Sequence, residues 1–193
     1  MRNILFILAV LLFLSNRNIS AQGDSLKNRV SFEPFYLTMN GIRINYERHL
    51  KKGHWLEIGP QFYASENESK TSKYNSLKGL GTSVYYKSFL DKKKRGHGTY
   101  IAFGGMMCNY WIEYPHDKLI SKTNFPKFGG DVIVGYNFAT ISDMITAEIY
   151  AGLGYRYANT KNPYILSNFT DFYTSYAWTG NIMVLGAKIG FSF

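Results

Sequence analysis

The chain has 193 residues and a formal net charge of +9 at pH 7, but charged residues make up only 18% of it. This length predicts one domain, the single cysteine excludes an internal disulfide, and no nucleic-acid recognition module accompanies the positive charge. Aromatic residues make up 17%, mostly Tyr and Phe, and there are 18 Gly. Such a composition is typical of strands that face lipid on one side and a polar interior on the other.

Residues 1–21 have the features of a cleavable secretory signal peptide. Arg2 precedes an unbroken apolar run over 4–14, and a polar stretch then closes on Ala21. The run is about half of the ~20 residues that a membrane-spanning helix needs, so we expect cleavage after Ala21 rather than a retained helical anchor. The mature domain is then 22–193, and no later apolar run approaches helical spanning length.

Extended segments follow the signal peptide, separated by polar or turn-rich links. Each has about 9 to 14 residues, enough for a tilted strand to cross a bilayer. The segments are 29–37, 41–50, 53–64, 78–90, 98–111, 127–139, 145–157 and 180–193. Because an even number of antiparallel strands can close on itself, the predicted fold is all-β. It is an eight-stranded up-and-down transmembrane β-barrel preceded by the signal peptide.

The links support this topology, since long and short ones alternate after the first. The long links are 65–77, 112–126 and 158–179, and the short ones are "KK", "DKKKRGH" and "TISDM". Outer-membrane barrels have short periplasmic turns and longer outer loops. We therefore place the short links at the periplasm, where their lysines could bind lipid phosphates, cell-wall material or an acidic partner, or simply keep the turns solvated.

Alternation along the strands divides the side chains into two faces. The lipid face is predicted to contain Ile42, Ile44, Tyr46, Leu56, Ile58, Phe62, Leu80, Val84, Tyr86, Val132, Val134, Tyr136, Phe138, Ile149, Leu153 and Tyr155. The opposite face contains polar residues and most of the glycines, including Gly59, Gly79, Gly81, Gly135, Gly152 and Gly154. Glycines suit a face that is crowded, and the interior of an eight-stranded barrel is narrow.

Two features leave the register open. Pro34 and Pro60 lie inside predicted strands, where each removes a ladder hydrogen bond, so we expect a bulge or a shifted boundary at each. The segment 98–111 is apolar on both faces, and its register cannot be assigned from the pattern.

The inward face is predicted to hold a polar network. Its members are Glu33, Arg43, Glu47, Glu57, Lys87, Asp131, Glu148, Arg156 and Lys188, five acids and four bases. Charges in so narrow an interior should be paired, because an isolated buried charge is costly. We expect a salt-bridged plug rather than a proton relay, an ion pathway or an open pore.

The terminal "GAKIGFSF", the signal segment and the strand rhythm together resemble the small outer-membrane β-barrel proteins of the OmpA-like and OmpX-like group. The stretches "VSFEPFYLTMNGIRINYERHL" and "WLEIGPQFY" are similar to the opening strands of its Bacteroidota-type members. The resemblance implies an outer-membrane location, surrounding lipid, and insertion by the barrel-assembly machinery. By the same resemblance, Phe191 and Phe193 would form the insertion signal.

The function predicted from these observations is non-enzymatic: a structural role, or surface contacts through the outer loops with an unidentified surface or cell-wall partner. No catalytic residue, cofactor or metal is assigned. One alternative is a lipid A deacylase or acyltransferase on the same barrel, for which His116 beside Asp117, with Ser121 nearby, is the one outer candidate. Another is a secreted soluble barrel that binds a small hydrophobic ligand.

Overall fold

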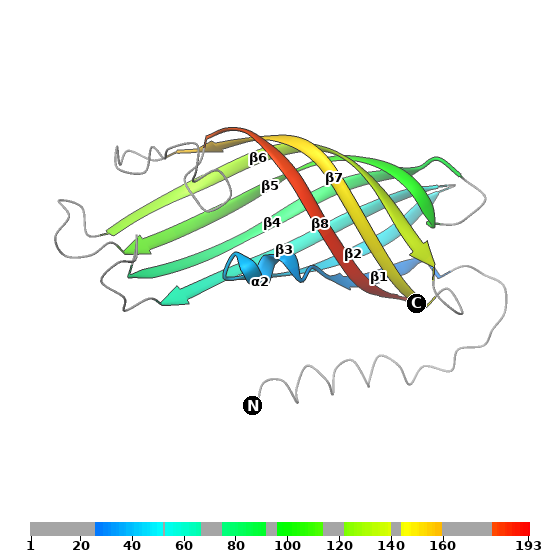
Figure 1. Ribbon diagram of the computed structural model, residues 1–193, viewed down its shortest axis with the longest axis horizontal. Helices are drawn as coiled ribbons and strands as arrows, with labels where there is room; N and C mark the ends of the chain where they lie inside the picture. The colour runs from blue at the N-terminus through cyan, green and yellow to red at the C-terminus, as the bar shows by residue number, and fades with distance from the viewer. Residues whose placement is uncertain are drawn as a thin grey trace, which may run out of the picture.

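Eight antiparallel strands in the described residues close into one barrel, in the order of the sequence (Figure 1). This computed structural model describes residues 26–51, 53–66, 75–91, 96–113, 122–139, 144–159 and 179–193, so the predicted signal peptide lies outside it. The strands are β1 (Asn28–Phe32), β2 (Gly41–Lys51), β3 (His54–Glu66), β4 (Ser76–Phe89), β5 (Gly98–Glu113), β6 (Lys122–Ala139), β7 (Ile145–Ala158) and β8 (Gly180–Ser192). The predicted all-β up-and-down barrel is confirmed.

Some strands extend further toward the long links than the sequence predicts. β6 begins at Lys122 rather than at 127, and β5 ends at Glu113 rather than at 111. The two strands stay in register up to the pair Glu113↔Lys122, whose exposed side chains form an ion pair of 2.8 Å. The alternation of hydrophobic and polar residues stops before this point. These strand ends are held only by backbone pairing, so the sequence pattern could not locate them.

The first predicted strand, 29–37, is wrong in its second half. β1 ends at Phe32, and Pro34 begins a short helix, α2 (Phe35–Thr38). Pro34 has helical backbone angles, φ −63° and ψ −25°. Its fixed φ and missing N–H are well tolerated at a helix start, whereas a central strand needs that donor. No helix in the described part of the chain is long and apolar enough to cross a membrane.

The early end of β1 shortens the pairing that closes the barrel. β1 pairs with β8 only from Arg29↔Ser192 to Phe32↔Ile189. β7, in contrast, pairs with β8 up to Gly180. Among the described residues, positions 180–188 of β8 therefore have no strand on their β1 side. In this region α2 lies beside β2. The distance between β8 and α2 increases toward the first residues of β8 (Figure 1). We call this stretch between β8 180–188 and α2 the seam.

Pro60 does not produce the bulge that the sequence predicts. The pairs between β2 and β3 stop at Arg43↔Gln61, resume at Tyr46↔Ile58 and keep one register across the interruption. On its other side β3 pairs with β4 without interruption, including Pro60↔Thr82. The missing N–H therefore weakens one ladder locally without shifting it, and the register shift in this ladder lies instead between His49 and Lys51.

The register of β5 is now defined. β5 pairs continuously with β4 and β6, and its even-numbered residues point inward. Tyr100, Ala102, Cys108 and Tyr110 are buried, whereas Ile101, Phe103, Met107 and Trp111 are exposed. Because its inward side chains are as apolar as its outward ones, alternation gave no signal in this strand.

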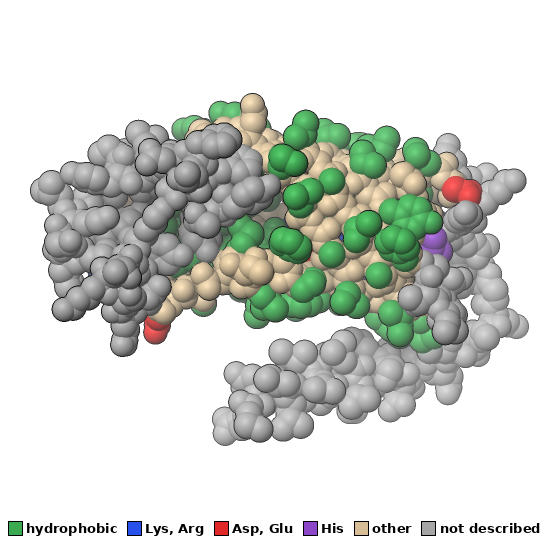
Figure 2. Space-filling model, in the orientation of Figure 1, with side chains coloured by type: hydrophobic (Ala, Val, Ile, Leu, Met, Phe, Trp, Pro, Cys, Tyr) green, Lys and Arg blue, Asp and Glu red, His purple; other side chains and the backbone are tan. Residues whose placement is uncertain are grey.

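The outer surface of the barrel is apolar, as the alternation predicts. Large exposed side chains include Ile42, Ile44, Ile58, Phe62, Leu80, Val84, Val132, Val134, Ile149 and Leu153. On the face seen in Figure 2, hydrophobic side chains cover the middle of the wall, and acidic ones lie only near its two ends. Many charged side chains of the strands, such as Glu57, Lys87 and Glu148, are buried inside instead.

Candidate functional site

Alternation along the strands brings all nine side chains predicted for the lumen into the interior. Glu33, Arg43, Glu47, Glu57, Lys87, Asp131, Glu148, Arg156 and Lys188 are all buried. Two further bases that the sequence analysis did not assign, Arg29 and Lys127, are buried with them. The sequence did contain this information, because residues an even number of positions apart on one strand face the same side. Arg29 is two positions from Ser31, and Lys127 is four positions from Asp131. In the described residues the interior thus holds five acids and six bases.

The centre of the network joins strands that are far apart in the sequence. Glu57 on β3 accepts from Lys87 on β4 and from Lys188 on β8, each at 2.7 Å. Glu148 on β7 contacts the same two ammonium groups at 3.0 and 3.1 Å. It also accepts hydrogen bonds from Tyr100 at 2.6 Å and from Asn137 at 3.2 Å. Two carboxylates and two lysines therefore neutralise one another across the barrel.

One like-charge pair in this network is held together by a lysine. Glu47 and Glu57 lie directly opposite each other on β2 and β3, an arrangement that alone would be destabilising. Lys87 Nζ lies 3.1 Å from Glu47 Oε1 and 2.7 Å from Glu57 Oε2, so one ammonium group bridges both carboxylates. Glu47 also contacts Arg29 at 3.3 Å.

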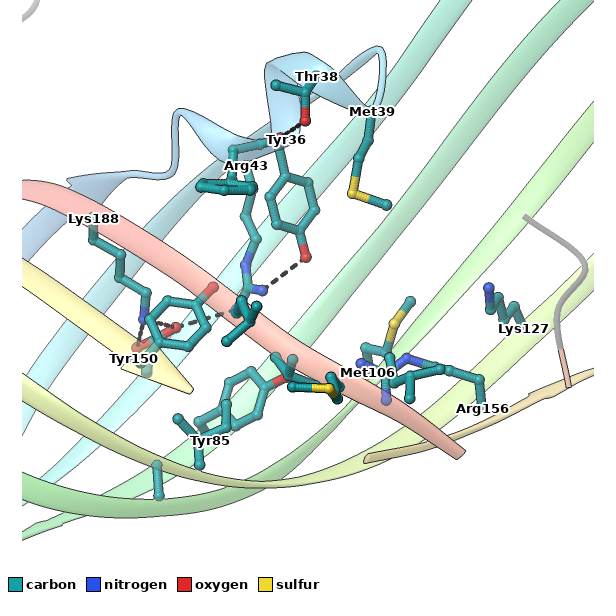
Figure 3. A pocket seen from close by; sticks show the side chains of 18 of the residues that line it. Tyr36, Thr38, Met39, Arg43, Tyr85, Met106, Lys127, Tyr150, Arg156 and Lys188 are labelled. Atoms are coloured by element: carbon teal, nitrogen blue, oxygen red, sulfur yellow. Dashed lines mark hydrogen bonds and ion pairs between the residues drawn. The ribbon is translucent and has the colours of Figure 1, made fainter. Parts of the chain in front are cut away.

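Arg43 connects the network to α2. Its guanidinium lies 3.3 Å from Glu33 and 3.2 Å from Glu57, and Nη1 donates to the Tyr36 hydroxyl at 2.9 Å. The ring of Tyr36 also lies against that of Tyr63, with centroids 6.0 Å apart. The helix that replaces the end of β1 is therefore fixed to the interior through Tyr36 (Figure 3).

Tyrosine hydroxyls complete the coordination of the buried carboxylates. Tyr150 donates to Glu33 at 2.6 Å, and Tyr85 donates to Asp131. Asp131 also pairs with Arg156 on β7, at 2.5 Å. Hydrogen bonds of this kind offset the free-energy cost of removing each carboxylate from water. Sequence reasoning did not assign these tyrosines, although the parity of Lys87 and Glu148 places Tyr85 and Tyr150 on the inward face.

The inward-facing tyrosines of the strands each lie opposite a glycine on a neighbouring strand. The directly paired positions are Tyr63 with Gly41 and Gly79, Tyr85 with Gly104, Tyr100 with Gly135, Tyr110 with Gly79, and Tyr150 with Gly186. A Cβ on Gly135 would lie 2.3 Å from the Tyr100 hydroxyl, and one on Gly186 would lie 2.3 Å from the Tyr150 ring. The glycines therefore make room for the rings that hold the network.

Apolar clusters lie on both sides of the ion pairs. Toward the long links, Tyr63, Leu77, Cys108, Tyr110, Ile112, Phe125 and Ala158 form one cluster. Toward the short links, Trp55, Phe89 and Tyr100 belong to a second cluster, and the guanidinium of Arg29 lies 5.0 Å from the Trp55 ring centroid. The Arg29 Nη2 also donates to the Gly96 carbonyl at 3.2 Å.

A cavity of about 610 Å³ lies within the barrel. Tyr36 and Met39 line it beside α2, and Lys127 and Arg156 lie at the right of the view in Figure 3. Lys188, Lys87, Arg43 and Glu57 of the ion network also line it. The cavity therefore borders both charged and apolar side chains.

The residues considered for catalysis or metal binding are placed only in part. His116, Asp117 and Ser121 lie outside the described residues, so the structure does not position the candidate for lipid chemistry. His97 Nδ1 lies 3.3 Å from the Asn137 Oδ1 atom, and Cys108 is a buried free thiol. Within the described ranges, no group of three His, Cys, Asp or Glu side chains is arranged to hold a metal ion.

Phe191 and Phe193 lie beside the ladder that closes the barrel. Their ring centroids are 6.4 Å apart and the rings are stacked. Phe193 and Asn28 exchange two backbone hydrogen bonds, of 2.9 and 3.0 Å. This end of β8 is therefore held by β1.

No protein family and no curated protein matches this chain. Its structure is similar to that of the N-terminal β-barrel domain of Pseudomonas aeruginosa OprF, with a TM-score of 0.48 and 12% sequence identity. The alignment covers 88% of this chain and 98% of the OprF domain. At this level of likeness, function has to be inferred from the geometry of the barrel itself.

Replacing Glu148 by Gln should strongly destabilise the barrel. Gln keeps the size of the side chain but leaves two buried lysines with one carboxylate fewer, and removing one partner from a buried pair costs about 3–5 kcal/mol. The measurement is the free energy of unfolding in urea, in lipid vesicles. Glu113→Gln is the control, because its ion pair with Lys122 is exposed and should contribute no more than about 1 kcal/mol. Equal effects of the two variants would contradict a structural role for the buried network.

Replacing Gly135 by Ala should lower the unfolding free energy by about 1–3 kcal/mol, because the added methyl group must displace the Tyr100 hydroxyl from Glu148. Gly130→Ala is the matched control on the same strand. A Cβ at Gly130 would have its nearest neighbour, the Gly104 carbonyl oxygen, at 3.8 Å. The control should change stability by no more than about 0.5 kcal/mol. A Gly135 variant as stable as the Gly130 variant would show that the ring opposite can move freely.

Proposed function

We propose that this chain is an integral outer-membrane β-barrel without catalytic activity, with a lumen closed by ion pairs. Its role would be structural or based on contacts made by its outer connections. The observation that carries this proposal is the orientation of the side chains. Leu153 on β7 is 69% exposed, whereas Glu148 on the same strand is 2% exposed.

An apolar outer wall has a physical cost in water. Soluble monomers rarely expose contiguous apolar patches larger than a few hundred Å². Here large apolar side chains are exposed on all the strands from β2 to β8. A bilayer removes this surface from water, and outside the seam the strands pair with neighbours on both sides, which provides partners for their backbone groups. The arrangement is the reverse of a soluble barrel that carries a small hydrophobic ligand among apolar inward side chains.

A closed lumen is the second part of the proposal. Ten of the eleven ionisable side chains assigned to the interior form ion pairs with one another in the described residues. Apolar clusters lie on both sides of them along the barrel. Interiors of this strand number are filled by side chains or hold at most one small ligand, so the network supports a plug better than an ion pathway.

The remaining assignments are also proposals. The resemblance of the terminal strand supports Phe191 and Phe193 as an insertion signal for the barrel-assembly machinery, and the same resemblance supports export by residues 1–21. Outer-membrane lipid would then surround the wall. The basic short links, whose positions 52 and 92–95 lie outside the described residues, would contact lipid phosphates or a cell-wall partner.

A charge on the outer wall distinguishes a lipid-facing barrel from a soluble one. Leu153→Arg should lower the unfolding free energy in vesicles by about 2–4 kcal/mol, the cost of Arg near the bilayer midplane. Ile145→Arg, at the end of the same strand, should cost at most about 1 kcal/mol, because the cost falls toward the interface. If Leu153→Arg is as stable as the parent and more soluble, the wall does not face lipid.

The proposal as a whole is tested with the mature chain purified and refolded into lipid vesicles. A closed barrel should migrate differently in unboiled and boiled samples on a detergent gel, and it should stay with the membrane after carbonate washing. A planar bilayer containing it should show no steady current if the lumen is plugged. Release by carbonate would contradict the membrane location, and a steady current would contradict the plug. An altered lipid A profile in a deletion strain would favour the enzymatic alternative.

A further inference from the structure

The cavity reaches the free edge of β8. Its lining includes Ile182 and Val184 from the inward face of this strand and Met183 and Leu185 from the outward face. Met183 and Leu185 are among the exposed side chains of the wall. A cavity lined by residues of both faces of one strand reaches the edge of that strand. It does so at the seam, where β8 has no strand on its β1 side among the described residues.

Lys127 carries a positive charge that the described side chains of the interior do not neutralise. It is only 9% exposed and lines the cavity, yet no described residue forms a hydrogen bond or ion pair with it. Among the described residues the interior holds six bases against five acids, and all five acids are paired with bases other than Lys127. A buried cation without a partner is costly, so the site favours a ligand that supplies one negative charge.

Of the residues that the structure describes, the neighbours of Lys127 on its own and the adjoining strands cannot supply that charge. Cys108 and Ala158 lie directly opposite it on β5 and β7, and Phe125 and Gly129 flank it on its own strand face. Among the described residues, the other charged group nearby is Arg156, a second cation (Figure 3). Its guanidinium is paired with Asp131. An anion bound at Lys127 would therefore have two bases near it, Lys127 and Arg156. Among the described residues, the acid near it would be Asp131, which is already paired with Arg156.

We propose that the cavity binds a long-chain fatty acid, which enters from the membrane through the seam and places its carboxylate against Lys127. The carboxylate supplies the single charge that the described interior residues lack. The alkyl chain follows the apolar lining of Met106, Ile133, Ile182 and Val184 and passes the β8 edge toward Met183 and Leu185. A volume of about 610 Å³ lies within the usual range for small-molecule sites, about 300–1,000 Å³. Lateral entry depends on the wall facing lipid and therefore rests on the proposed function.

The test measures binding of palmitate by the refolded full barrel in phosphatidylcholine vesicles, with hexadecanol as the neutral probe of equal chain length. Palmitate should bind at least about tenfold more tightly than hexadecanol, because a charge-assisted contact in a buried site is a strong one. Lys127→Met should remove that difference. Lys122→Met, the exposed lysine on the same strand, should leave it unchanged. Equal binding of the two probes, or of palmitate to the parent and Lys127→Met, overturns the carboxylate assignment.

The route of entry is tested by filling the cavity at the seam. Val184→Trp should weaken palmitate binding at least about tenfold, since the indole would occupy the space beside the β8 edge. Ile189→Trp is the control, because this outward residue lies where β8 is still paired with β1. Unchanged binding to Val184→Trp overturns the lateral route. Each variant is first checked for heat-dependent gel migration and for carbonate resistance. A barrel that inserts but binds no palmitate contradicts this inference alone, whereas one that fails to insert contradicts the proposed function.

Discussion

The pairing of charges inside a narrow barrel is the constraint on which the rest of the structure depends. Each buried ion would cost several kcal/mol if left alone. Glu57 reaches neutrality only because β2, β4 and β8 deliver Arg43, Lys87 and Lys188 to the same place. The register of strands on both sides of the barrel is therefore set by the interior charges as well as by the apolar outer face.

The same constraint explains why α2 can replace half of a strand. The chain leaves the ladder after Phe32 and gives up pairing with β8, but Tyr36 then binds Arg43. The interior thus retains a ligand for its guanidinium where the wall loses a strand. The wall and the interior are thereby coupled at the seam, and the least completely paired part of the barrel borders its cavity.

The period-two pattern was sufficient to predict the strands and their faces, because lipid outside and charge inside impose it directly on residues such as Val134 and Asp131. It could not predict α2, since Pro34 is compatible with both a strand edge and a helix start. It could not orient β5, whose two faces are equally apolar. The sequence pattern also could not predict which charged residues pair with one another in the lumen. Lys188 meets Glu57 from 131 positions away, and such pairing follows from the stagger of the closed sheet rather than from any local spacing.

The opposition of rings and glycines has a consequence for how this sequence can change over time. A larger residue at Gly135 or Gly186 is acceptable only where the tyrosine across the ladder has first become smaller, and the loss of that tyrosine removes a hydroxyl from a carboxylate. Substitutions at positions that are distant in the chain should therefore occur together. In distant descendants of this barrel, the inner wall should diverge as coordinated sets of substitutions, while the oily exterior changes one residue at a time.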